Sequence, residues 1–193
     1  MDLELTGLDP RKDHIVAIGA VPIEEGRVVL GSTLYTLVRT SRPSELGAIL
    51  THKLRSADLE GAPPIDEALE LLAGALAGRA AVFHCAAIER GFLGPLFASR
   101  RARMPDAADT QVLARLWLLQ RGEPAPAGLP LTRLARMLGQ DTEITHHALG
   151  DALMTAQVFI ALATHLEKRE PQSVGKLVRA ADHFRGAGRF GPI

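Results

Sequence analysis

The chain has 193 residues, 47% of them hydrophobic and 23% charged, which is typical of one globular domain with a substantial buried core. Lysine plus arginine and aspartate plus glutamate both number 22, so the formal net charge is zero and a strongly basic, autonomous nucleic-acid binder is excluded. A single cysteine, Cys85, excludes an intrachain disulfide, and no apolar run has the length of a membrane span, so we expect a cytoplasmic protein.

The chain opens on a segment in which two acids alternate with leucines. In an extended segment, Asp2 and Glu4 project from one face while Leu3 and Leu5 point toward the core. Two carboxylates held this close together repel each other, and a bound cation usually offsets that cost. The pair is therefore compatible with a metal site without requiring one.

Strand patterns follow the opening segment. Residues 14–23 are apolar and β-branched and predict a buried strand, and residues 27–39 predict the returning strand of a hairpin around a turn at 24–26. A short helix is expected over residues 44–53, with Ser44 as its N-cap.

Helical patterns dominate the remainder of the chain, which continues after a break at residues 61–64. The expected elements are a helix over 66–78, a strand over 80–84, and helices over 86–100, 110–120, 131–138 and 148–167. Residues 168–193 are basic and rich in glycine, so we expect a mostly flexible tail behind a domain of residues 1–167. Strands first, then helices alternating with short strands, predict an α/β fold with a mixed sheet covered on both faces.

A second set of polar residues lies at the start of the last helix. His146 lies in the loop that enters this helix, and Asp151 lies in its first turn. An acid at that position interacts favourably with the helix dipole, so Asp151 alone is more typical of simple N-terminal stabilisation. A histidine five residues earlier, in the pattern His-x-Ala-x-x-Asp, weakens that simple interpretation considerably.

Glu89 is a third candidate, at the start of the helix that follows the strand ending at His84. Glutamate on a helix is most often a solvated charge, and for Glu89 taken alone that interpretation is favoured. The residue gains interest only in combination with the other acids.

Taken together, these residues resemble the three motifs of the DEDDh 3′–5′ exonucleases, the DnaQ-like group of the ribonuclease-H-like superfamily. The matching segments are Asp2-x-Glu4 followed by Thr6-Gly7, His84 to Glu89 followed by Phe92-Leu93, and His146-x-Ala148-x-x-Asp151. The resemblance covers about residues 1–167. It implies a three-layer fold whose mixed central sheet has three antiparallel strands followed by parallel strands, with helices on both faces.

The resemblance also implies an activity, namely hydrolysis of phosphodiester bonds at single-stranded DNA or RNA 3′ ends, with release of nucleoside 5′-monophosphates. Two Mg²⁺ or Mn²⁺ ions would take part, and His146 would accept the proton of the attacking water. Four acids would hold the ions: Asp2, Glu4, Glu89 and Asp151. The run after the first acids would contact the substrate: Leu5, Thr6 and Gly7. The implied partners are nucleic-acid 3′ ends and a polymerase or repair protein, with no membrane.

Three departures from the family pattern leave a second class of function open. Glu89 stands where the family has aspartate, and Leu5 stands where it has threonine. One residue precedes Asp2, so we expect a truncated first strand and either a natural start farther upstream or a sequence that is a fragment. The alternative is a nucleic-acid-binding or scaffold module with an impaired exonuclease site. A purely structural domain is a third interpretation, and the spacing of the acids argues against it.

Overall fold

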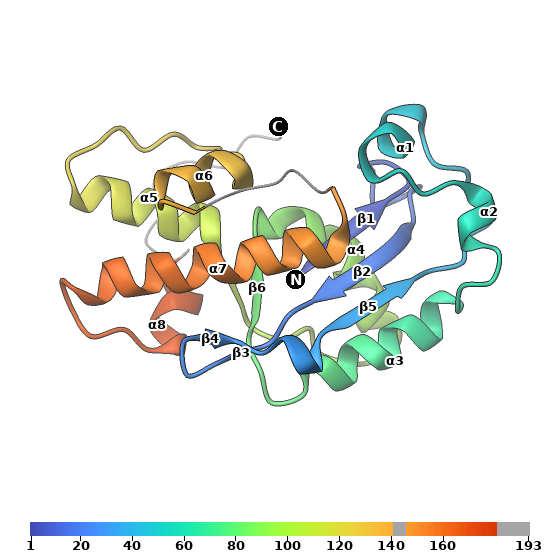
Figure 1. Ribbon diagram of the computed structural model, residues 1–193. Helices are drawn as coiled ribbons and strands as arrows, with labels where there is room; N and C mark the ends of the chain where they lie inside the picture. Colours follow the sequence, from blue (N-terminus) through green and yellow to red (C-terminus); the bar gives the residue numbers. More distant parts are fainter. Residues whose placement is uncertain (141–145, 181–193) are drawn as a thin grey trace.

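Two groups of strands form the centre of the molecule, which a computed structural model describes for residues 1–140 and 146–180 (Figure 1). The first group is an antiparallel sheet in the order β1-β2-β5, with bounds Asp2–Leu5, Ile15–Ala20 and Leu34–Leu37. The second is the parallel pair β6-β7, with bounds Ala81–Phe83 and Ala107–Asp109. The antiparallel strands come first and the parallel strands later, as the sequence predicts.

The two groups meet at the beginning of the chain. The ammonium group of Met1 donates a hydrogen bond of 2.8 Å to the carbonyl oxygen of Val82, in β6. β1 is four residues long, so it pairs with β2 along its length but reaches β6 only through this terminal group. The short first strand that the sequence predicts is present, and the antiparallel group and the parallel pair are separate sheets.

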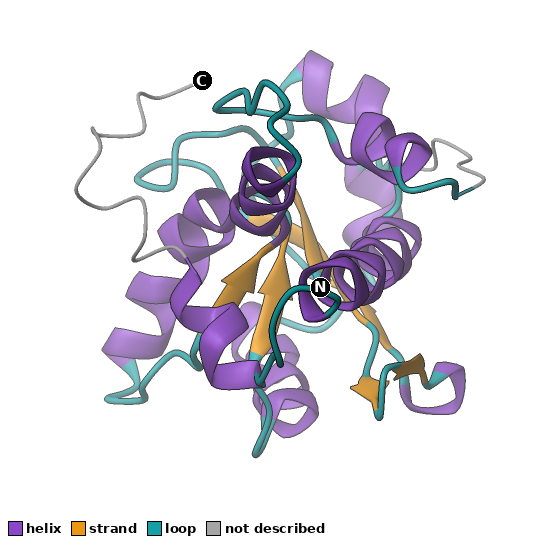
Figure 2. Cartoon of the chain, turned by 90° about the vertical axis from the view of Figure 1, so that its left-hand side faces the viewer, coloured by secondary structure: helices purple, strands orange, loops and turns teal. Residues whose placement is uncertain are grey.

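Helices cover both faces of the strands, which gives the expected three-layer α/β arrangement (Figure 2). The helices that follow the first sheet, in chain order, are α3 (Ile65–Leu76), α4 (Ala86–Ser99), α5 (Thr110–Gln120), α6 (Leu131–Met137) and α7 (Ala148–Glu167). The other elements are β3 (Ile23–Glu24), β4 (Arg27–Val28), the 3-10 turn η1 (Leu30–Ser32), α1 (Leu46–His52), α2 (Ser56–Leu59) and α8 (Val174–Arg179).

The buried apolar side chains form two clusters. In one, α3 and α4 pack against β1, β2 and β6, with Phe83, Leu72 and Leu93 fully buried. In the other, α5, α6 and α8 pack against α7, around Leu113 and Leu162. Because α7 also contacts β1 and β2, it connects the second cluster to the sheet.

Two local expectations are wrong in the first fifty residues. The strand expected over 27–39 is interrupted, because Gly31-Ser32 lie in a 3-10 turn; β4 pairs with β3, and β5 pairs with β2. Ser44 is not the N-cap of α1, because that helix begins at Leu46 and Glu45 takes the cap position. The backbone N–H of Glu45 instead donates to the carbonyl oxygen of Thr6, which ties α1 to the end of β1.

The segment after residue 167 also differs from expectation. Residues 174–179 form α8, and Leu177 is buried against the second cluster, so a flexible tail from residue 168 is wrong for this part. Ser173 caps the helix, because its side chain accepts a hydrogen bond from the N–H of Lys176. Residues 181–193 lie outside the described residues.

The helix α7 is long and apolar enough to cross a membrane by length and composition, contrary to the expectation that no segment is. Its contacts show a different use, because it packs on β1, β2 and β6 and on α5 and α6. Val158 and Leu162 of this helix are fully buried. In this fold α7 is a core helix.

Candidate functional site

The strand β1 presents its two acids toward the first turn of α7. Asp2 lies opposite Gly19 in the register of β1 and β2, and Glu4 lies opposite Ala17. Leu3 is buried in the apolar cluster on the other face, so the strand alternation expected from the sequence is present.

Gly19 allows α7 to approach the sheet closely. A Cβ atom on this residue would lie 2.2 Å from the carbonyl oxygen of Ala148 and 2.6 Å from the backbone nitrogen of Leu149. Both distances are too short for non-bonded atoms, so only glycine fits against the start of the helix. The contact brings the first turn of α7, which carries Asp151, beside the residue paired with Asp2.

The result is a cluster of three carboxylates from two distant parts of the chain. One oxygen from each of Asp2, Glu4 and Asp151 lies within 4.8 Å of the other two. Oε1 of Glu4 is buried and has no hydrogen-bond partner among the described residues. A hard divalent cation takes several oxygen ligands of this kind, so the donor set and the unpaired oxygen fit such an ion.

Burial and mutual repulsion make the cluster costly to charge. Burial, followed by the neighbouring Asp151 carboxylate, raises the pKa of Asp2 to about 7. Burial, followed by the charges of Asp2 and Asp151, raises the pKa of Glu4 to about 8. Carboxylates with raised pKa values in one cluster are typical of functional sites, because a compensating cation or proton is needed there.

Glu89 approaches the same region from α4. It is 4% exposed, so the interpretation of this residue as a solvated helix charge is wrong. Burial, followed among the acids by Asp2, raises the pKa of Glu89 to about 8, which places the two carboxylates within electrostatic reach. Oε2 of Glu89 has no hydrogen-bond partner within the described part of the chain. Glu89 nevertheless lies outside the group of three whose oxygens approach within 4.8 Å.

Asp109 fixes the helix that carries Glu89. Its carboxylate accepts hydrogen bonds from the backbone N–H groups of Cys85 and Ala86, at 3.2 and 2.9 Å, at the start of α4. It also accepts one from Gln111, at 2.9 Å, at the start of α5. One side chain therefore caps two helices, a role that the sequence analysis missed; its position just before a helical pattern is the available signal.

Two histidines lie at the entry to α7. His146 is exposed and has a left-handed backbone with φ of 40°, immediately before the N-cap residue His147. The ring of His147 stacks on Tyr35, in β5, with ring centroids 4.5 Å apart. Burial and the nearby Glu4 raise the pKa of Tyr35, so this pair borders the carboxylates. Sequence reasoning missed Tyr35, because a tyrosine in a strand carries no distinguishing signal.

The three residues expected to contact the substrate lie at the end of β1 and directly after it. Leu5, Thr6 and Gly7 are all buried, and their contact with a substrate stays a prediction. The hydroxyl of Thr6 donates to Asp13 at 3.3 Å and accepts from the N–H of His14 at 2.9 Å. The run therefore shapes the turn after β1.

Asp13 is the centre of that turn. It accepts hydrogen bonds from the backbone N–H of Asp9 at 2.9 Å and from the Arg42 side chain at 2.8 Å. A Cβ atom on Gly7 would lie 2.5 Å from Oδ2 of Asp13, so glycine is required for this packing. Large apolar side chains are exposed beside the turn and on the helix tied to it: Leu8, Leu46 and Leu50.

Comparison with known proteins agrees with this geometry. Residues 1–159 match the model of the RNase T family, described as Exonuclease. The chain is 31% identical over 171 residues to a DNA polymerase III PolC-type of Thermotoga petrophila, and 32% identical over 180 residues to a DNA polymerase III subunit epsilon-like protein of Rhodobacter capsulatus. The matches cover 87% and 92% of this chain but 12% and 25% of those relatives, so the chain spans a quarter of their length or less.

Solved structures show the same fold. Exonuclease X in complex with 5′ overhanging duplex DNA superposes with a TM-score of 0.70 at 22% identity, over 93% of this chain and 96% of that one. The nuclease domain of 3′hExo, a DEDDh family member, gives a TM-score of 0.68 at 14% identity, over 89% and 92% of the two chains. With residues 1–159 matching the exonuclease family model, the chain belongs to the DnaQ-like exonuclease family of ribonuclease-H-like fold.

Proposed function

We propose that this chain is a 3′–5′ exonuclease that hydrolyses phosphodiester bonds at single-stranded DNA or RNA 3′ ends and releases nucleoside 5′-monophosphates. The observation that carries the proposal is the cluster of Asp2, Glu4 and Asp151, whose oxygens lie within 4.8 Å of one another. Membership of the exonuclease family supports the same reaction class.

The cofactors in this proposal are two Mg²⁺ or Mn²⁺ ions. Asp2, Glu4 and Asp151 would hold one ion, and Asp2 together with Glu89 would hold the other. When bound, such ions activate water and neutralise charge on the phosphate and on the leaving 3′-oxygen. The unpaired buried oxygens of Glu4 and Glu89 support both placements, because each lacks a protein partner among the described residues.

His146 is the proposed general base. It is exposed and lies five residues before Asp151, outside the helix. An imidazole there can accept a proton from a water molecule held over the carboxylates and release it to solvent.

The proposed substrate is a single-stranded end with unpaired bases. Leu8, Leu46 and Leu50 are between 72% and 76% exposed, and they lie on the turn after β1 and on the helix tied to it. Exposed apolar side chains beside a charged site suit the faces of unstacked bases. The polymerase III relatives support a polymerase or repair partner and a cytoplasmic location for this chain.

The test is hydrolysis of end-labelled single-stranded DNA and RNA in Mg²⁺ or Mn²⁺. We expect stepwise loss of nucleoside 5′-monophosphates from the 3′ end, and no loss for Asp2→Ala or in excess chelator. Glu70→Gln, at an exposed position on α3, is the matched control and should keep full activity. Cleavage that persists in chelator would contradict the proposal.

A nucleic-acid-binding module with an impaired site is the second candidate. It is favoured by one observation, namely that Glu89 lies outside the group of three carboxylates. It predicts binding of single-stranded ends without turnover. Recovery of cleavage in Glu89→Asp, which restores the family's residue, would distinguish it from the first proposal.

A further inference from the structure

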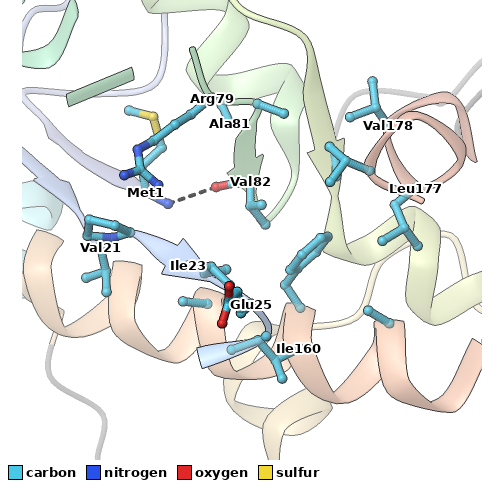
Figure 3. Close-up of a pocket in the computed structure, with 18 of the residues that line it drawn as sticks. Met1, Val21, Ile23, Glu25, Arg79, Ala81, Val82, Ile160, Leu177 and Val178 are labelled. Carbon is cyan, nitrogen blue, oxygen red and sulfur yellow. Dashed lines mark hydrogen bonds between the residues drawn. The ribbon is translucent and has the colours of Figure 1, made fainter. Parts of the chain in front are cut away.

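The two ends of α7 are supported in different ways. A cavity of about 780 Å³ borders the later turns of the helix, where Phe159 and Ile160 line it (Figure 3). Side chains that line a cavity have fewer partner atoms than side chains in a filled core. The beginning of α7, by contrast, lies directly against the sheet at Gly19. Contacts at this end therefore place the residues that lead into the helix.

One row of residues crosses the antiparallel sheet beneath the beginning of α7. Asp2 lies opposite Gly19 in the register of β1 and β2, and Gly19 lies opposite Tyr35 in the register of β2 and β5. Residues directly opposite each other in antiparallel strands project from the same face of the sheet. Asp2 and Tyr35 therefore flank Gly19 on the face that carries α7.

Tyr35 contacts the residue that begins α7. Its ring stacks on the ring of His147, with centroids 4.5 Å apart and an angle of 24° between the ring planes. His147 is the N-cap residue of α7, and its side chain makes no capping hydrogen bond to the described helix. The aromatic contact is thus the interaction that holds this side chain.

His146 directly precedes the stacked pair. Its backbone has a φ of 40°, in the left-handed region that is costly for a residue with a Cβ atom. Such a conformation persists only where the surrounding contacts hold it. The next two residues supply contacts of this kind, because His147 stacks on Tyr35 and Ala148 packs against Gly19.

We propose that Tyr35 is a positioning residue for the reaction, because its stack with His147 holds His146 in place to accept a proton. The inference rests on the proposed function, in which His146 is the general base. The stacking contact is made by the ring of Tyr35, so an aromatic side chain at position 35 is what the role requires. Tyr35 acts through His146 and not through contact with the substrate.

The experiment measures kcat and KM for nucleotide release by the full chain in Mg²⁺. Tyr35→Ala should lower kcat by about tenfold and leave KM unchanged, because a misplaced base slows proton transfer without weakening substrate binding. Tyr35→Phe keeps the ring and is the matched variant that should restore kcat. In a His146→Ala background, Tyr35→Ala should have no further effect, since no imidazole remains to be positioned.

A second variant breaks the same stack from its other side. His147 is exposed, so His147→Ala should fold, and it should lower kcat as much as Tyr35→Ala does. Tyr35 itself is 37% exposed, and thermal melts of both variants check that the fold is kept. The double variant should lose no more activity than either single variant, because both remove one contact.

Backbone dynamics test the inference without activity. We expect an NMR order parameter of about 0.85 for the His146 amide in the parent and in Tyr35→Phe, and a value below about 0.6 in Tyr35→Ala. A parent chain that hydrolyses no nucleic acid would refute the proposed function, whereas these order parameters would still show whether Tyr35 orders His146.

Other results would overturn the inference. A higher KM with unchanged kcat in Tyr35→Ala would show that the ring binds the substrate. An equal loss of activity in the parent and in the His146→Ala background would show that Tyr35 does not act through His146. Unchanged kcat, or an unchanged order parameter for the His146 amide, would show that the stack is a packing contact alone.

Discussion

Asp151 and Glu89 reach the neighbourhood of Asp2 from two helices, and those helices are held in different ways. α7 carries Asp151 and is placed by backbone contact, because its first residues lie against Gly19. α4 carries Glu89 and is placed by a cap, because Asp109 accepts two hydrogen bonds at its start. The placement of α7 depends on the absence of a Cβ methyl group at Gly19. The placement of α4 depends on the charge and the side-chain length of Asp109.

The largest expected effect comes from changing Asp2, which both Asp151 and Glu89 approach. Asp2→Asn should lower nuclease activity by about a thousandfold or more, because an amide would be a poorer ligand than the carboxylate that would hold both proposed ions. In chelator the same variant should melt at a higher temperature, since it relieves repulsion with Asp151. Activity assays and thermal melts check both changes, and activity within tenfold of the parent would refute the proposed role of Asp2 as a metal ligand.

The arrangement that depends on backbone contact is tested by one added methyl group. Gly19→Ala should lower activity by about a hundredfold, because the Cβ displaces the start of α7 and moves Asp151 away from Asp2. Gly74→Ala, at a helical position with open space around its Cβ, is the control. The control should keep full activity and gain about 0.5–1 kcal/mol in the free energy of unfolding. Equal activity in both variants would contradict the placement of α7 by Gly19.

Glu89, the acid that the capped helix α4 carries, is tested by a substitution that keeps its shape. Glu89→Gln should lower activity by about tenfold, less than Asp2→Asn, because Glu89 lies outside the closest group of carboxylates. In chelator, above the raised pKa of about 8, its melting temperature should rise, since the buried side chain no longer carries a charge. A rise in melting temperature with unchanged activity would show that Glu89 is a buried acid without a part in the reaction.

The smallest expected effect is a pH dependence of stability common to both arrangements. Asp2, Glu4 and Glu89 have pKa values raised from 3.8 or 4.5 to about 7 or about 8, so the folded chain holds protons that the unfolded chain releases. In chelator, stability should therefore fall as pH rises from about 4 to about 8 and then level off. Thermal melts should show this fall, and Mg²⁺ or Mn²⁺ at pH 8 should reverse it. A melting temperature that rises over this range would contradict the raised pKa values.

Local patterns in the sequence predict much of the fold. The alternation of acids and leucines places Asp2 and Glu4 on one face of β1, and helical periodicity predicts α3 to within two residues at its end. β7 escapes prediction, because Ala107 and Ala108 have low strand propensity and are buried only through pairing with β6. The sequence does not predict α8, because the segment is basic and has one apolar residue, Leu177, that packs into the second buried cluster.

The site required information that local patterns do not carry. The motif match identifies Asp151, but its approach to Asp2 depends on Gly19, which in the sequence is one glycine in an apolar run. The burial of Glu89 depends on packing between α4 and the strands, so its position in a helix suggested solvent exposure instead. Contacts between residues far apart in the chain decide both cases.

Asp109 caps both α4 and α5, and this shared cap limits how far either helix can move relative to the other. Because one carboxylate secures the beginnings of α4 and α5 together, neither helix can slide along its axis without loosening the other. The hydrogen bonds of Asp109 therefore fix the backbone position of residue 89 relative to α5. With the backbone fixed, the distance from the carboxylate at position 89 to Asp2 depends on the length of the side chain. Glutamate in place of aspartate lengthens that side chain by one methylene group.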